Sequence, residues 1–167
     1  ATRGNLALTT SNTTAFDVKA HTVNGDLSIN TGGNITQTGA LTVTGASSFT
    51  SSGTDNDITL GTNTNAFTGA VSSTTAGTSG NVVIDNGTTA LNIGTSNVNG
   101  NFTVTAGDSI TDSGVITVGG TASFITDTSD KLITLNSQNA ITGQVTFDTT
   151  STGGDVTFDN GTTAISL

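Results

Sequence analysis

Apolar residues along this chain come in short alternating pairs, in which a polar residue separates two apolar ones. Leu27-Ser28-Ile29 and Phe102-Thr103-Val104 are examples. Alternation with a period of two residues predicts a β-strand with one buried face. Gly, Asn, Asp and Ser fill the gaps between the pairs, as turns require. No stretch places apolar residues at helical spacing over several turns, so the pattern predicts an all-β fold of many short strands.

The strand pattern repeats at a nearly fixed interval. Val23-Asn24-Gly25 returns as Val98-Asn99-Gly100, a shift of 75 in the numbering, and the stretch 85–90 returns as 159–164, a shift of 74. Self-similarity at a fixed period over most of a chain indicates a repeat architecture. We therefore divide the chain into a partial repeat (1–22), a full repeat (23–97) and a near-full repeat (98–167), which together form one continuous solenoid segment. Both ends fall within the repeat, so we expect the chain to be part of a longer array.

The repeat predicts a parallel β-helix, or β-solenoid. Each unit of about 74–75 residues carries four apolar clusters, which predicts four turns of about 19 residues. Stacked turns place each strand about 4.8 Å from the next and bury the apolar residues inside. The residues expected to form this core stack are Leu27, Leu41, Phe49, Ile58, Val82, Leu91, Phe102, Ile116, Phe124, Ile133, Val156 and Ile165. A β-sandwich also gives strands at regular spacing, but a long repeat made of sub-turns favours the solenoid.

Composition and charge narrow the possible partners. Charged residues make up 9% of the chain, and twelve Asp against three Lys and Arg give a net charge of −9. Such a surface repels nucleic acid and anionic membranes, which attract Lys and Arg. The chain contains no Cys, which excludes thiolate metal sites, and no apolar run approaches the length of a transmembrane helix. We therefore predict neither nucleic-acid binding nor membrane insertion.

Two stretches carry a resemblance to a known family. These are Gly100-Asn101-Phe102-Thr103-Val104-Thr105-Ala106-Gly107-Asp108-Ser109-Ile110-Thr111-Asp112-Ser113-Gly114 and Gly39-Ala40-Leu41-Thr42-Val43-Thr44-Gly45. They resemble the repeats of filamentous-haemagglutinin-like bacterial surface proteins. The resemblance implies a right-handed parallel β-helix, export across the bacterial envelope, and a role as an adhesive or structural filament. The secretion and receptor-binding parts of such proteins lie outside repeats of this kind.

One turn motif occurs in both copies. It is Asp85-Asn86-Gly87 in the first copy and Asp159-Asn160-Gly161 in the second. Asn-Gly favours positive φ at a tight turn, and an Asp side chain can bond the backbone just beyond it. We interpret these residues as structural turns.

Two neighbouring carboxylates are weak candidates for a metal site. Asp55 and Asp57 could hold Ca²⁺ through oxygen ligands. Their aligned positions are Asp130 and Leu132, so the second copy has lost one acid. A recurring calcium site should recur, and an ordinary turn is therefore the favoured interpretation.

The chain has few of the side chains that could form a catalytic site. A Ser-His-Asp arrangement would depend entirely on His21, the only histidine. Gly119-Gly120 precedes no predicted helix, so it does not form a phosphate loop. A polysaccharide-cleaving β-helix enzyme would need acids clustered with a basic residue in one groove, whereas the acids here are scattered. We predict neither an enzyme nor a cofactor.

The expected function is that of a non-catalytic repeat segment in a long extracellular fibre or adhesin shaft at the bacterial cell surface. Its expected partner is itself, through end-to-end stacking into a filament or through neighbouring repeats of one giant chain. Host or matrix glycans form a further class of partner. The alternative is a binding module, either similar to a phage fibre or a carbohydrate- or calcium-binding passenger domain.

Overall fold

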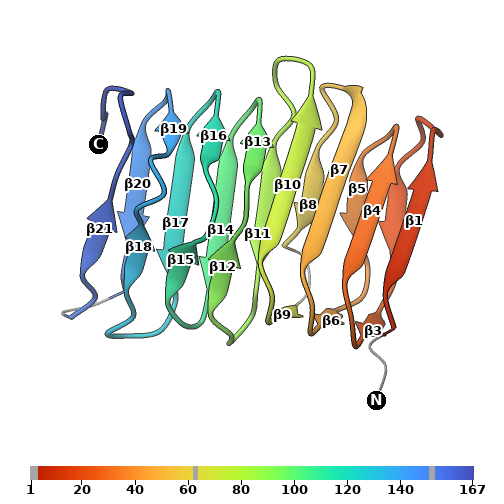
Figure 1. Cartoon of the computed structure of the whole chain (residues 1–167), viewed down its shortest axis with the longest axis horizontal. Helices are drawn as coiled ribbons and strands as arrows, with labels where there is room; N and C mark the ends of the chain where they lie inside the picture. Colours follow the sequence, from red (N-terminus) through yellow and green to blue (C-terminus); the bar gives the residue numbers. More distant parts are fainter. Residues whose placement is uncertain (1–3, 62–63, 151–152) are drawn as a thin grey trace.

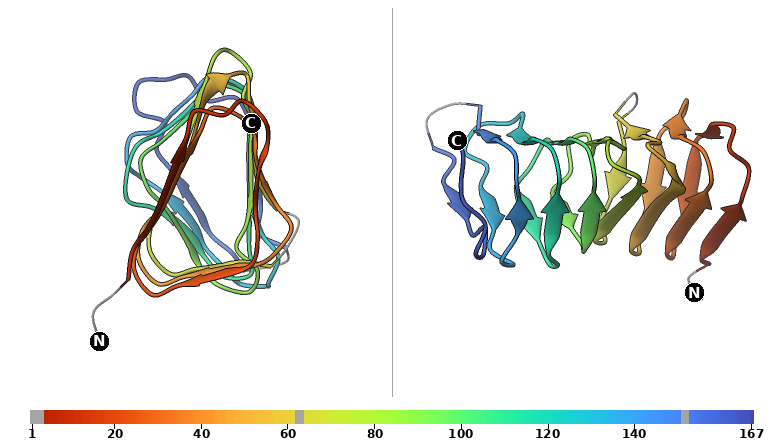
Figure 2. Two further views of the ribbon diagram at one scale, coloured as in Figure 1. Left: turned by 90° about the vertical axis from the view of Figure 1, so that its right-hand side faces the viewer. Right: turned by 90° about the horizontal axis from the view of Figure 1, so that it is seen from above.

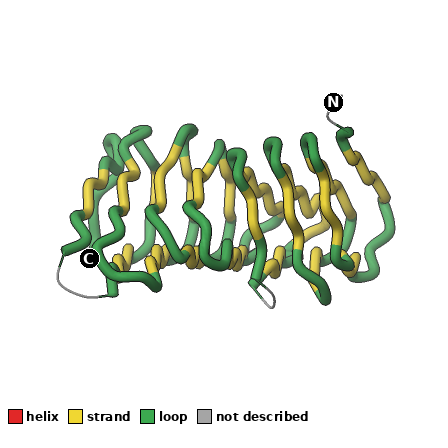
Figure 3. Tube along the Cα trace, turned by 90° about the horizontal axis from the view of Figure 1, so that it is seen from below, coloured by secondary structure: helices red, strands yellow, loops and turns green. Residues whose placement is uncertain are grey.

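The computed structural model describes residues 4–61, 64–150 and 153–167, and within these ranges it contains 21 strands and no helix. The strands form the sides of a three-sided coil, with rows of strand segments joined by loops (Figure 3). The chain runs up the front in β1, β4 and β7, returns down the back in β5 and β8, and advances from right to left (Figure 1). The coil is therefore right-handed. The predicted parallel β-helix is confirmed, with about seven turns spaced roughly 21 residues apart.

The strands form three columns of parallel strands. Column 1 contains β1 (Leu6–Thr10), β4 (Leu27–Thr31), β7 (Ser47–Thr54), β10 (Val71–Ala76), β13 (Ser96–Val98), β16 (Ile116–Val118) and β19 (Ala140–Ile141). Column 2 contains β2 (Phe16–Val18), β5 (Ile35–Gln37), β8 (Ile58–Leu60), β11 (Val82–Asp85), β14 (Phe102–Ala106), β17 (Ala122–Thr126) and β20 (Val145–Asp148). Column 3 contains β3 (His21–Val23), β6 (Leu41–Val43) and β9 (Ala66–Phe67). The remaining strands continue the sheet of column 1 beyond β10, beside β13, β16 and β19, and they are β12 (Leu91–Ile93), β15 (Ile110–Asp112), β18 (Ile133–Leu135) and β21 (Val156–Phe158).

The number of turns per repeat differs from the prediction. Strand β1 returns as β11 and again as β21, so one repeat holds ten strands. The sheet that runs from β1 to β21 takes seven pairing steps, so one repeat makes about three and a half turns rather than the four shorter turns that we predicted. The prediction was wrong because it was based on apolar clusters alone. Short strands such as β9 bury a single large side chain, Phe67, which looked like a minor anchor within a longer turn.

Successive repeats are consequently rotated by about half a turn. The first repeat has its long strands in column 1, where β4, β7 and β10 have 5, 8 and 6 residues. The equivalent strands of the second repeat, β14, β17 and β20, lie in column 2 and have 5, 5 and 4 residues. Viewed along the axis, the later turns have their corners at different places from the early ones (Figure 2). The first strands of the three copies alternate between two sheets, because β1 and β21 lie in one sheet and β11 lies in another.

The rotation takes place where β10 meets the following turn. Val71 at the start of β10 is in register with Ile93 at the end of β12, whereas Thr74 further along is in register with Asn97 of β13. The long strand β10 is thus followed in the next turn by two short strands, β12 and β13. The corner between these two short strands lies against the middle of β10. Column 3 accordingly ends at β9, and β12 pairs with β10 in the sheet of column 1.

The core runs through the whole coil. Ten of the twelve residues predicted for the core stack are at most 2% exposed, namely Leu27, Leu41, Phe49, Ile58, Val82, Leu91, Phe102, Ile116, Phe124 and Ile133. The other two predictions were wrong, because Val156 and Ile165 are 41% and 55% exposed. Both lie in the last turn described, where no following turn covers them. Aromatic side chains also stack between turns, and the ring centroids of Phe124 and Phe147 are 5.8 Å apart.

Candidate functional site: the polar corners and the two ends

Buried asparagines occupy corners of the coil in both repeats. Asn65 and Asn86 return in the second copy as Asn139 and Asn160, and all four are at most 3% exposed. Each Oδ1 accepts a hydrogen bond from the backbone N–H of a strand residue one turn earlier. The donors and N–O distances are Leu41 at 2.8 Å, Phe67 at 2.7 Å, Ile116 at 2.8 Å and Ile141 at 2.8 Å. A buried amide that is bonded in this way holds two turns together without leaving a polar group unsatisfied.

The Asp-Asn-Gly turns position two of these asparagines. Gly87 and Gly161 both have a φ of 56°, a left-handed conformation that glycine adopts without strain. The backbone N–H of Gly87 donates to Asp85 Oδ1 at 2.8 Å, and that of Gly161 donates to Asp159 Oδ1 at 2.8 Å. The Asp side chain thus closes the turn while the Asn side chain points inward, between the two turns.

A second ladder of Asn and Asp side chains precedes the strands of column 2. Asn34 Oδ1 accepts from the N–H of Asp57, and Asp57 Oδ1 accepts from that of Asn81, at 3.0 and 2.7 Å. Asn81 in turn accepts from Asn101, and Asn101 from Thr121, at 2.8 and 2.9 Å. Sequence reasoning missed this ladder and the buried asparagines. The buried asparagines could have been found from the sequence, because Asn65 and Asn86 recur in phase with the repeat.

The weak metal candidates Asp55 and Asp57 both bind the next turn. Asp55 Oδ1 accepts from the backbone N–H groups of Thr78 and Ser79 at 2.6 and 2.9 Å. These two groups, Thr78 first, hold the pKa of the Asp55 carboxyl below its usual value of 3.8. Among the described residues there is no group of three or more His, Cys, Asp or Glu side chains that could hold a metal ion. The carboxylates act here as caps for backbone groups.

Two basic residues, Lys131 and His21, lie at the surface of the coil. Lys131 Nζ contacts Asp108 Oδ1 of the preceding turn at 3.1 Å. The backbone N–H of Ser109 and then Lys131 hold the pKa of the Asp108 carboxyl below its usual value. His21 is exposed on β3, and its Nδ1 lies 2.8 Å from the backbone oxygen of Lys19. Exposed ion pairs of this kind contribute little to stability.

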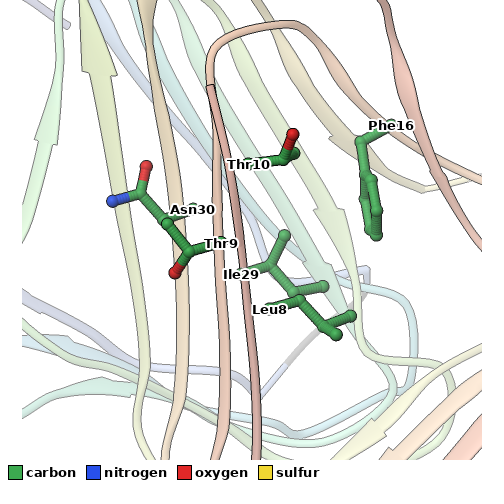
Figure 4. A pocket seen from close by; sticks show the side chains of 6 residues that line it. All are labelled: Leu8, Thr9, Thr10, Phe16, Ile29 and Asn30. Carbon is green, nitrogen blue, oxygen red and sulfur yellow. The ribbon is translucent and has the colours of Figure 1, made fainter. Parts of the chain in front are cut away.

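The N-terminal end of the coil opens into an apolar pocket. Leu8, Phe16 and Ile29 form its apolar lining, and Thr9, Thr10 and Asn30 complete it (Figure 4). Leu8 and Phe16 are only partly buried, whereas Ile84 and Leu91, their counterparts in the second repeat, are 2% and 1% exposed. The difference arises because the second repeat is covered by the turns of the first. At the other end, Val156, Ile165 and Leu167 are exposed.

Comparison with known proteins identifies the family to which the chain belongs. The model of "Repeats of unknown function (DUF5649)" matches twice, over residues 3–74 and 79–148. The first match runs from β1 into β10 and the second spans β11 to β20, so each covers the ten-strand unit. The comparison with curated proteins and the comparison with solved structures found no match. No helix in the described ranges is long and apolar enough to cross a membrane. Since the two matches cover most of the sequence, the chain belongs to the DUF5649 family of repeats.

Proposed function

We propose that this chain is a non-catalytic structural segment of a long extracellular fibre or adhesin shaft at the bacterial cell surface. The observation that carries the proposal is the continuity of the coil. Parallel strands, an apolar core and side-chain ladders run from the first turn to the last without an interruption by a helix or a second domain within the described residues. The resemblance to filamentous-haemagglutinin-like repeats supports the bacterial surface as the location.

The geometry suits a stiff rod. Each turn is joined to the next by backbone hydrogen bonds, for example over five consecutive pairs between β4 and β7. The asparagine corners add bonds between turns at the points where the strands stop. In repeat coils each unit contacts only its neighbours, so length can be added without changing the fold.

The two ends favour association with further copies. The open edges of β1 and β21 carry strand backbone that can accept another strand. Apolar side chains accompany these edges at both ends, with Leu8 and Phe16 at one and Val156 at the other. The sides of the coil repel other copies, because the chain carries a net charge of −9. End-to-end growth, either within one long chain or between chains, is therefore favoured over side-by-side clustering.

The test is a series of tandem chains observed by electron microscopy. The first member joins residues 1–153 to a second copy of residues 4–167, so that Gly4 follows Gly153 in phase with the repeat. Each added repeat should lengthen the particle by about 17 Å, which is about three and a half turns at about 4.8 Å per turn. Compact particles whose length does not increase with the number of repeats would refute the shaft.

A further inference from the structure

We propose that Asn24 is a site of spontaneous deamidation and that a preceding repeat of the shaft protects it. Deamidation converts an Asn side chain into a carboxylate. It is favoured where Gly follows, because Gly has no side chain to hinder the attack of its own backbone nitrogen. The first half of this inference concerns the single chain, whereas the second half rests on the proposed function.

The chain contains four Asn-Gly pairs, at positions 24–25, 86–87, 99–100 and 160–161. In two of them the Asn is buried at a corner of the coil, since Asn86 and Asn160 are 0% and 3% exposed. Each Nδ2 donates to a backbone oxygen of the preceding turn. The N–H groups of Gly87 and Gly161 donate to the Asp side chains of their own turns. The amide and the attacking nitrogen are thus both held in these two pairs.

The third pair is held by residues of the preceding turn. Asn99 is half-buried, and its Nδ2 donates to the backbone oxygen of Thr75 at 2.9 Å, while its own N–H donates to Thr75 Oγ1 at 3.0 Å. The nitrogen that would attack the Asn99 amide belongs to Gly100, and its N–H donates to the backbone oxygen of Gly80 at 2.8 Å. Deamidation here would require these hydrogen bonds to break, which costs free energy at a partly buried site.

The fourth pair lacks these restraints. Asn24 is the equivalent of Asn99 in the first repeat, and it is exposed. Within the described residues no hydrogen bond holds its side chain or the N–H of Gly25. The position that corresponds to Thr75 would precede Ala1, so this chain supplies no such partner. Water therefore reaches the Asn24 amide, and the Gly25 nitrogen is free to attack it.

The reaction needs only the chain and water. The Gly25 nitrogen loses its proton to solvent and bonds to Asn24 Cγ, after which the Cγ–Nδ2 bond breaks and Nδ2 takes up a proton and leaves as ammonia. Water then opens the resulting succinimide at either carbonyl group, which gives Asp or isoaspartate at position 24. Because the nitrogen must first be deprotonated, the rate should rise with pH.

Isoaspartate would disturb the corner between β3 and β4. The backbone oxygen of Val23 accepts from Thr44 N in the next turn at 3.0 Å. The backbone oxygen of Gly25 accepts from Gly45 N at 2.9 Å. Isoaspartate routes the backbone through the side chain and so inserts an extra carbon between these two anchored groups. The corner must then shift, whereas the Asp product adds only a negative charge at an exposed position.

A preceding repeat would supply the missing partner. In the tandem chain that joins residues 1–153 to residues 4–167, Thr149 of the first copy takes the place of Thr75, because the two are equivalent in the repeat. Asn24 of the second copy should then be held as Asn99 is, and Asn24 of the first copy should stay open. Deamidation would thus mark the open end of a shaft and spare its internal junctions.

Ageing of the natural chain at mildly alkaline pH is the first test, with the four pairs compared by peptide mapping and mass spectrometry. We expect Asn24 to lose ammonia about tenfold faster, or more, than each of the others. Asn99 is the matched control, because both lie in a Val-Asn-Gly sequence and should react at the same rate in denaturant. Equal rates at Asn24 and Asn99 in the folded chain, or a faster reaction at Asn99, would overturn the site. So would an advantage of Asn24 that persists in denaturant.

A variant confirms which residue gives the product. Asn24→Gln keeps an amide but would have to close a larger ring, so the acidic species that forms on ageing should disappear. Persistence of that species in the variant would assign the reaction to another residue and overturn the site.

The tandem chain tests the protection. Thr22→Ser in the second copy gives the two Asn24 peptides different masses. We expect the first-copy Asn24 to react as in the single chain and the second-copy Asn24 to react as slowly as Asn99. Equal reaction in both copies of a tandem that lengthens as predicted would overturn the protection and leave the shaft intact. A tandem that does not lengthen would refute the shaft and the protection together, whereas the site in the single chain would stand on the first test.

Discussion

Asn86 binds both backbone groups of Phe67. Its Oδ1 accepts from Phe67 N at 2.7 Å, and its Nδ2 donates to Phe67 O at 3.2 Å. The carboxamide thus makes the two hydrogen bonds to β9 that the backbone of a neighbouring strand would otherwise make. Asn160 binds Ile141 in the same way, at 2.8 and 3.0 Å, so the arrangement belongs to the repeat.

Replacing Asn86 should destabilise the coil. Asn86→Ala leaves the N–H and carbonyl groups of Phe67 without their partner in a buried site, which costs about 1–3 kcal/mol. Urea unfolding followed by circular dichroism measures the loss. Asn24→Ala is the matched control, because Asn24 is exposed and the same truncation there should change stability by less than about 0.5 kcal/mol. Equal effects of the two substitutions would contradict the role of Asn86.

Truncating the core should have the larger effect. Phe124 and Ile133 are fully buried, and their replacement by Ala leaves cavities that cost about 3–5 and 2–5 kcal/mol. The denaturation midpoint should fall in both variants. Ile165→Ala, at a position that is 55% exposed, is the control and should leave the midpoint nearly unchanged. Midpoints for Phe124→Ala and Ile133→Ala that match the parent would show that the stacked core is wrong.

The two turn glycines should differ in their tolerance of alanine. Both have a φ of 56°, and an alanine in this region costs about 1–2 kcal/mol. A Cβ on Gly87 would also lie 2.1 Å from Thr64 Cγ2, whereas the nearest atoms to a Cβ on Gly161 are 3.3 Å away. Gly87→Ala should therefore destabilise more than Gly161→Ala in thermal unfolding. The reverse order would contradict the geometry of the turn.

The cap formed by Asp55 should be lost in acid. Its folded-state pKa lies below 3.8, so the carboxylate contributes stability above that pH, and the contribution disappears as the pH falls through the folded-state pKa. Asp55→Asn keeps an acceptor oxygen and tolerates the φ of 58° but removes the charge. The parent should be the more stable protein at neutral pH, and the difference should shrink below pH 3.8. A difference that is constant across the titration would exclude this linkage.

Calcium should leave the melting temperature unchanged. Asp55 and Asp57 already accept hydrogen bonds from Thr78, Ser79 and Asn81, so binding a cation would require these bonds to break. Melting curves with excess Ca²⁺ and with a chelator should therefore coincide. A calcium-dependent rise would instead favour the passenger-domain alternative.

The sequence predicts the β-helix fold more fully than it predicts the number of strands in each turn. Alternating pairs such as Leu27 and Ile29 identify strands because a half-buried strand has a period of two, and the regular recurrence of whole motifs along the chain identifies stacking. The number of strands per turn was not predictable. A two-residue strand such as β9 buries one large side chain and leaves no alternation to detect.

The polar corners show a second limit of sequence reasoning. Asn is common in turns, so the local sequence does not distinguish Asn65 and Asn139 from ordinary turn residues. Their burial depends on a backbone N–H that belongs to the preceding turn of the coil, and local patterns do not contain that information. The exposure of Val156 and Ile165 likewise depends on which turns are present to cover them.

The rotation between successive repeats has a mechanical consequence. A coil with all its long strands on one side would resemble a plank, which bends more easily in one direction than in another. Here the long strands lie in column 1 in the first repeat and in column 2 in the second, and β21 begins the third copy in the sheet of β1 again. The broad side therefore alternates between two faces from one repeat to the next. A shaft built in this way would resist bending more evenly than a plank does.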